Sequence, residues 1–169
     1  MNKKNAITVL IIFFSVSSNS SNLERLVIPD GFEISIFADK LESPRQIAET
    51  DSGYVIAGSK KGDKIYALQD SDLDGYAENK ILIADGLQNP TGVSFYQGNL
   101  YFAEIDTIWV INNIDDWLNT GSEILPTKTV FMNDLPSETW HGFKYIDFGP
   151  DGNLYIPVGV PCNICLEPQ

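Results

Sequence analysis

The chain has 169 residues and a formal net charge of −12, with 23 acidic side chains against 11 lysines and arginines. Such an acidic surface repels phosphate backbones, so the composition argues against nucleic acid as a partner. It is compatible with cations, Ca²⁺ among them.

The first predicted element is a secretory signal peptide over residues 1–22. Lys3 and Lys4 form a basic n-region, residues 6–16 form an apolar h-region, and residues 17–22 are small and polar. The h-region is too short for a membrane-spanning helix, and no cysteine beside it offers a lipoprotein anchor. We therefore expect a periplasmic or secreted protein without a stable membrane anchor. An uncleaved anchor or a buried apolar segment is the alternative.

Three similar openings then divide the chain into repeats. Each combines a short apolar strand with an acidic turn, and they cover residues 36–44, 82–90 and 130–136. Equivalent leucines recur after 46 (87 − 41) and then 48 (135 − 87) positions, at Leu41, Leu87 and Leu135. A period near this length, with several short strands in each repeat, is typical of propeller blades.

Further predicted strands follow each opening. They cover residues 46–50, 54–57, 64–68, 92–96, 99–103, 107–112, 143–148 and 153–158. The sequence Gly-Asn-Leu-Tyr is identical at 98–101 and 152–155, and its glycine supplies the positive φ that a hairpin turn requires. Only residues 115–119 predict a helical turn. We therefore predict an all-β fold, a β-propeller, with a sandwich of coincidental spacing as the alternative.

The number of blades creates a difficulty of length. Residues 23–169 are enough for about three blades, whereas propellers typically need four to eight blades to close. We therefore expect these residues to be the N-terminal part of a longer propeller domain. Such a part would leave an apolar blade face and strand edges uncovered.

Four segments together resemble one known family. They are 41–45 (Leu-Glu-Ser-Pro-Arg), 86–93 (Gly-Leu-Gln-Asn-Pro-Thr-Gly-Val), 140–155, and 158–165, which ends in Cys-Asn-Ile-Cys. They are similar to the secreted quinoprotein sugar dehydrogenases, the sorbosone or aldose dehydrogenase group that uses pyrroloquinoline quinone. The resemblance implies a six-bladed propeller with the quinone at its central mouth.

The resemblance also implies a reaction. An aldose, or a sugar-like alcohol or aldehyde, would be oxidised with hydride transfer to the quinone, and the electrons would pass to a periplasmic acceptor. The present chain by itself is expected to be inactive. Two other function classes stay open: a secreted, non-catalytic propeller that binds a protein or a glycan, and a calcium-dependent hydrolase of the lactonase type.

His141 is the only histidine in the chain, and it precedes the Gly-Pro-Asp-Gly turn of the third repeat. An imidazole can accept a proton near neutral pH, and the resemblance implies that His141 acts as the general base. A structural histidine bonded to a neighbouring blade is the alternative. Some soluble glucose dehydrogenases carry an acidic residue just after the glycine that ends this blade strand. Here Val160 follows Gly159, so the group that orients the base is expected elsewhere.

Arg45 and Asn89 occupy the corresponding entrances of the first and second repeats. A guanidinium can bind a quinone carboxylate through two hydrogen bonds, and an amide can bind the quinone or the substrate. Both residues are therefore predicted to bind the cofactor. The alternatives are a salt bridge for Arg45 and an ordinary turn before Pro90 for Asn89.

An acidic stretch predicts a calcium loop. Its carboxylates have the Asp-x-Asp-x-Asp-Gly spacing that wraps a hard cation, and the expected ligands are Asp70, Asp72, Asp74 and Glu78. The stretch is not an EF-hand, because Ile81 stands at the twelfth position and no helices flank it. An acidic hairpin tip without a metal is the alternative.

Cys162 and Cys165 form a Cys-x-x-Cys pair. Leu166 follows where covalent haem attachment would need a histidine, and two thiols do not complete a structural zinc site. In a secreted protein the pair predicts a local disulfide, with a redox-active pair as the alternative.

Overall fold

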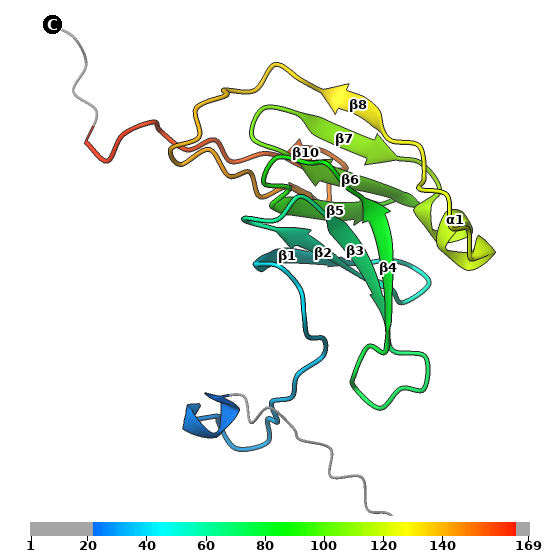
Figure 1. Cartoon of the computed structure of the whole chain (residues 1–169). Coiled ribbons are helices and arrows are strands. Elements are labelled where there is room, and N and C mark those ends of the chain that lie inside the picture. The colour runs from blue at the N-terminus through cyan, green and yellow to red at the C-terminus, as the bar shows by residue number, and fades with distance from the viewer. Residues whose placement is uncertain (1–21, 165–169) are drawn as a thin grey trace, which may run out of the picture. The chain divides into compact units, whose positions relative to one another are not determined.

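The computed structural model describes residues 22–164, which belong to two compact units, Met1–Ser35 and Ile36–Gln169 (Figure 1). The first unit contains a short 3₁₀ helix, η1 (Asn22–Arg25), after which the backbone N–H of Leu26 donates to the carbonyl of Leu23 at 2.9 Å. The signal peptide predicted over residues 1–22 lies outside the described residues except for its last position, and it stays a prediction. Across residues 22–164, no helix has both the length and the apolar character needed to cross a bilayer.

The second unit is built from antiparallel strands. The first sheet contains β1 (Pro44–Glu49), β2 (Val55–Ser59), β3 (Ile65–Gln69) and β4 (Asn79–Ala84). The second contains β5 (Gly92–Tyr96), β6 (Asn99–Ala103), β7 (Ile108–Ile111) and β8 (Thr129–Met132). A hairpin of β9 (Asp147–Phe148) and β10 (Leu154–Tyr155) follows. Helix α1 (Ile114–Thr120) lies in the connection from β7 to β8.

The strand β6 shows why these segments form stacked sheets. Leu100 and Phe102 are fully buried on one face, while Tyr101, on the other face, is partly buried. A strand that is apolar on both faces needs a packed layer against each face of its sheet. The turn that leads into β6 contains Gln97 and Gly98 with φ values of 49° and 79°, the left-handed conformation that a two-residue hairpin turn requires.

The two four-stranded sheets pack face to face, with β1 beside β5 and β5 beside β9 (Figure 1). One hydrophobic core joins the sheets and includes Ile56 and Ile83 from the first and Val93 and Phe102 from the second. A further core, made of Ala103, Ile108 and Ile146, joins the second sheet to the segment just before β9, and Leu154 of β10 packs against it. Radial packing of four-stranded meanders through their first strands is the blade arrangement of a propeller, which confirms the predicted fold. The described residues supply two blades and the first hairpin of a third.

Repeat boundaries and blade boundaries do not coincide. The apolar strands predicted to open the second and third repeats are the ends of β4 and β8, so they are the outermost strands of the preceding blades. Residues 36–38 form no strand. The carbonyl of Phe37 accepts from the backbone N–H of Ala77 at 2.7 Å, and the Phe37 side chain packs against Ala57 and Leu68 of the first blade.

The strands of the third repeat are shorter than predicted. The sequence predicts one strand over residues 143–148, but β9 contains only Asp147–Phe148. The reason is that the backbone of Ile146 is hydrogen-bonded to the side chain of Gln46 instead of to a neighbouring strand. This segment therefore crosses toward the first blade before β9 begins.

The antiparallel order divides the loops between two ends of the blades. The starts of β1, β5 and β9 and the β2–β3 loop share one end, which we call the entrance end. The β1–β2 and β3–β4 loops lie at the opposite end, which we call the far end. The acidic stretch of residues 70–78 joins β3 to β4 and therefore lies at the far end, where Figure 1 shows it as a protruding loop.

Candidate functional site

His141 lies in the connection between β8 and β9, at the entrance end of the second unit. Its side chain is exposed, and its Nδ1 is 2.8 Å from the backbone carbonyl oxygen of Val160. The indole of Trp140, a residue 60% exposed, is centred 5.1 Å from the imidazole. The structure therefore presents an accessible imidazole next to an accessible aromatic surface.

Arg45, at the start of β1, is connected to the same loop. Its Nε donates a hydrogen bond to the hydroxyl of Tyr145, and its guanidinium carbon lies 5.7 Å from the centre of the Tyr145 ring. Among the described residues Arg45 has no ion pair with a carboxylate, so the salt-bridge alternative is not what the structure contains. The first blade and the loop of His141 thus meet at Arg45 and Tyr145.

Gln46 makes a second connection between the same segments. Its Nε2 donates to the carbonyl of Ile146 at 2.7 Å, and its Oε1 accepts from the backbone N–H of Ile146 at 3.3 Å. One amide side chain therefore satisfies both polar groups of a buried residue that belongs to no strand. These hydrogen bonds join residues 100 positions apart in the sequence.

Lys144 is buried beneath this loop, with only 1% of its surface exposed. Its Nζ donates to the carbonyl of Gly142 at 2.6 Å, and no carboxylate among the described residues lies within ion-pair distance. Burial lowers the pKa of Lys144, while the charges of Asp106 and Glu138 act in the opposite direction. The sequence interpretation did not identify this residue.

A signal for the burial of Lys144 is nonetheless present in the sequence. Gly142, Lys144 and Ile146 alternate with Phe143 and Tyr145, and all three members of the first set are buried. A two-residue alternation of this kind places the lysine on the inner face of an extended segment.

Asn89 lies in the connection from β4 to β5, also at the entrance end. Its φ of 51° is left-handed, and its carbonyl accepts from the backbone N–H of Thr91 at 2.7 Å and from the Thr91 hydroxyl at 3.1 Å. The side-chain amide is half-buried and has no hydrogen bond within residues 22–164. Asn89 thus shares an end with Arg45 and His141, but no hydrogen bond within residues 22–164 joins it to either.

The predicted calcium ligands are brought together in part. Asp70, Asp72 and Glu78 each offer an oxygen, and these oxygens lie within 4.8 Å of one another. Asp74 is not in this group, and its carboxylate accepts from the backbone N–H of Tyr76 at 2.8 Å. The cluster lies at the far end of the first blade, so it is separated from the loop of His141 by the length of the strands.

The carboxylates of this loop also have partners within the loop itself. Asp70 accepts from the backbone N–H of Gly75 at 2.8 Å, and Glu78 accepts from that of Ser71 at 3.0 Å. The same geometry therefore stabilises the turn and gathers hard oxygen donors of the type that Ca²⁺ prefers.

The disulfide predicted between Cys162 and Cys165 stays a prediction, because Cys165 lies outside the described residues.

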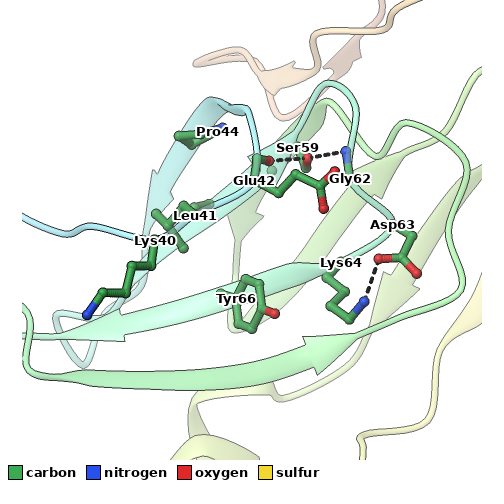
Figure 2. Close-up of a pocket in the computed structure, with 11 residues that line it drawn as sticks. Lys40, Leu41, Glu42, Pro44, Ser59, Gly62, Asp63, Lys64 and Tyr66 are labelled. Atoms are coloured by element: carbon green, nitrogen blue, oxygen red, sulfur yellow. Dashed lines mark hydrogen bonds and ion pairs between the residues drawn. The ribbon is translucent and has the colours of Figure 1, made fainter.

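A separate pocket of about 200 Å³ lies on the first blade (Figure 2). Residues 40–42 and Pro44 line it from one side, and β2, β3 and the loop between them line it from the other. Ser59 joins the two sides, since its hydroxyl donates to the carbonyl of Glu42 at 2.6 Å and accepts from the backbone N–H of Gly62 at 2.8 Å. None of the predicted site residues lines this pocket, and it is smaller than typical ligand sites of about 300–1,000 Å³. It is therefore not our candidate site.

A family described as a domain of unknown function, DUF7133, matches residues 23–163. An uncharacterized protein of Borreliella burgdorferi is 24% identical over 171 aligned positions, which cover 96% of this chain and 43% of that protein.

One solved structure supports the fold. It is a protein of Thermus thermophilus, provisionally described as an oxidoreductase (glucose dehydrogenase), with 18% identity and a TM-score of 0.51. The alignment covers 70% of this chain and 38% of that protein. At this identity the likeness shows the fold alone. The chain spans less than half the length of both proteins.

Proposed function

The chain belongs to the DUF7133 family, and we propose that it forms part of a quinone-dependent dehydrogenase acting on an aldose or a sugar-like alcohol or aldehyde. One observation carries the proposal. The single histidine is exposed at the entrance end, its Nδ1 is engaged by a backbone carbonyl, and no described residue hydrogen-bonds its Nε2. A ring nitrogen that is free of described partners at the entrance end of the blades can act as a general base.

The charged and polar groups at the entrance end fit a quinone that carries carboxylates. Arg45 presents an exposed guanidinium that can form two parallel hydrogen bonds with a carboxylate, and its Nε is hydrogen-bonded to the Tyr145 hydroxyl. No described residue forms a hydrogen bond with the side-chain amide of Asn89, so both its N–H donor and its oxygen acceptor can bind a ligand. We propose Arg45 and Asn89 as the residues of this chain that bind pyrroloquinoline quinone, which when bound would accept a hydride from the substrate.

The remaining roles follow from the positions of the side chains. His141 takes the hydroxyl proton of the substrate at Nε2. Trp140 offers an apolar surface on which a sugar ring can stack. Lys144 holds the base of the loop from below through the carbonyl of Gly142. In this proposal the electrons leave to a periplasmic acceptor, and the protein is secreted across the inner membrane.

The location of the carboxylate cluster separates this proposal from the hydrolase alternative. A calcium-dependent lactonase needs its metal at the catalytic centre, whereas Asp70, Asp72 and Glu78 lie at the opposite end of the blade from His141. We therefore propose a structural Ca²⁺ in this loop, with no part in the reaction.

The test uses the protein purified as its gene encodes it, without cofactor. Pyrroloquinoline quinone and Ca²⁺ are added, quinone binding is titrated, and dye reduction is followed across a panel of aldoses. His141→Ala should lower turnover by about 10²–10⁴-fold and leave quinone binding unchanged, since a general base contributes about that much. Arg45→Gln should weaken quinone binding by about tenfold or more.

Glu123→Gln serves as the matched control, because Glu123 is exposed and follows α1 at the far end. It should change neither measurement. Absence of quinone binding together with absence of turnover would contradict the proposal and leave a binding propeller. Turnover that needs a divalent ion but no quinone would establish a hydrolase instead.

A further inference from the structure

The contact between His141 and Val160 determines which ring nitrogen carries the proton. The Nδ1 of His141 lies 2.8 Å from the carbonyl oxygen of Val160. A carbonyl oxygen can only accept a hydrogen bond, so Nδ1 must be the donor. In the neutral imidazole the second nitrogen, Nε2, then bears the lone pair.

The contact exists because Gly159 has no side chain. A Cβ built on Gly159 would lie 2.3 Å from the carbonyl oxygen of His141 and 2.9 Å from the Cβ of His141. Distances below 3.0 Å between such atoms essentially never occur, so any larger residue would push the two segments apart. Gly159 is therefore the residue that lets the Val160 carbonyl reach the imidazole.

The backbone of His141 is itself held in an unusual conformation. Its φ is 55°, in the left-handed region that residues other than glycine rarely adopt. The next residue, Gly142, is held by two hydrogen bonds. Its backbone N–H donates to the carbonyl of Thr139 at 3.2 Å, and its carbonyl accepts from the Nζ of the buried Lys144 at 2.6 Å. The surrounding contacts thus compensate for a conformation that aims the ring at Val160.

We propose that the Val160 carbonyl keeps His141 in the Nδ1–H tautomer, with Gly159 as the positioning residue that admits this contact. In this proposal the backbone carbonyl of Val160 is the group that orients the base. This inference deepens the proposed function and rests on it for its catalytic meaning. The tautomer itself can be tested without any activity.

The proton balance of the step follows from this tautomer. The substrate loses its hydroxyl proton to Nε2 of His141, and its hydride would pass to the quinone when that cofactor is bound. The imidazolium then carries protons on both nitrogens, and the proton on Nδ1 stays there because a carbonyl oxygen is too weak a base to take it. Release of the Nε2 proton to water restores the starting tautomer.

The experiment is nuclear magnetic resonance of the ¹⁵N-labelled protein as its gene encodes it, with the ring nitrogens observed where the imidazole is neutral. If His141 is the only histidine in that protein, the signals are assigned at once; otherwise they are those lost in His141→Ala. We expect a protonated Nδ1 and an unprotonated Nε2. Gly159→Ala should produce a mixture of tautomers and lower kcat by about tenfold with little change in KM. Val158→Ala, an exposed neighbour, should change neither the signals nor kcat.

Two results would overturn the positioning proposal. One is a protonated Nε2 in the unaltered protein, which needs no variant to be measured. The other is a Gly159→Ala protein that keeps a pure Nδ1–H signal. The proposed function fails separately: a correct tautomer without quinone-dependent turnover would leave the role of Val160 and Gly159 in place and remove the dehydrogenase.

Discussion

Gly92, at the start of β5, is the position where one added methyl group should disturb the candidate site most directly. A Cβ built there would lie 2.4 Å from the carbonyl oxygen of Lys144 and 3.2 Å from the backbone nitrogen of Ile146. Both neighbours are backbone atoms of a segment that Gln46 holds by two hydrogen bonds, so they cannot rotate away as the end of a side chain could. Gly92→Ala should therefore push this segment off β5.

The expected cost has two parts. Overpacking of a well-filled interior costs about 1–3 kcal/mol, and each weakened hydrogen bond between Gln46 and Ile146 adds about 1 kcal/mol at most. We expect Gly92→Ala to lower the free energy of unfolding by about 3 kcal/mol. For a chain of this size that corresponds to a fall in Tm of roughly 6–12 °C.

Urea unfolding followed by tryptophan fluorescence, together with a thermal scan, measures both quantities. Gly98→Ala is the matched control, because a Cβ there meets nothing within 4 Å and the change is limited to a φ of 79°. That backbone strain should cost about 1–2 kcal/mol. A Gly92→Ala protein that loses no more stability than Gly98→Ala would refute the close packing of residues 144–146 on β5.

Two further predictions concern buried charge and metal. Burial lowers the folded-state pKa of Lys144 from its ordinary value of 10.5, so the unfolded chain binds more protons between the two values and stability should rise with pH toward 10.5. Lys144→Met should remove this rise, and urea unfolding at about pH 7 and about pH 10 checks it; equal pH slopes for both proteins would contradict it. Ca²⁺ should raise the Tm, by the equivalent of about 2.7 kcal/mol at a hundredfold excess over Kd, and Mg²⁺ should raise it less. Asp72→Asn and Glu78→Gln should each abolish most of the rise in Tm that Ca²⁺ causes. If Ca²⁺ does not change the Tm of the unaltered protein, the loop is not a calcium site.

Local signals carried the fold prediction because blades are built from short-range antiparallel pairs. The predicted strands 92–96 and 99–103 are β5 and β6, and the glycine turn between them needs only two adjacent residues to specify it. The boundary between blades was harder, because the strand at 82–84 belongs to the preceding sheet although it opens the sequence repeat. Hydrophobic periodicity is the same on either side of a blade boundary, so it cannot show which sheet a strand joins.

The candidate site divides in the same way. The sequence by itself determined that there is one histidine, that it precedes the hairpin of the third repeat, and that Arg45 and Asn89 stand at the entrances of the first and second repeats. The sequence also identified the acidic loop as a candidate calcium site, because the spacing of possible ligands along the chain is a local property. Strand order then decided that this loop lies at the far end of the blade, away from His141.

Only the tertiary structure decided what holds the site together. Arg45 reaches Tyr145, and Gln46 reaches Ile146, across 100 positions of sequence. The partner of His141 is a backbone carbonyl, and every residue has one, so the identity of Val160 carries no signal of its role. Such contacts depend on how the blades bring distant segments together, and that is a property of the packed molecule.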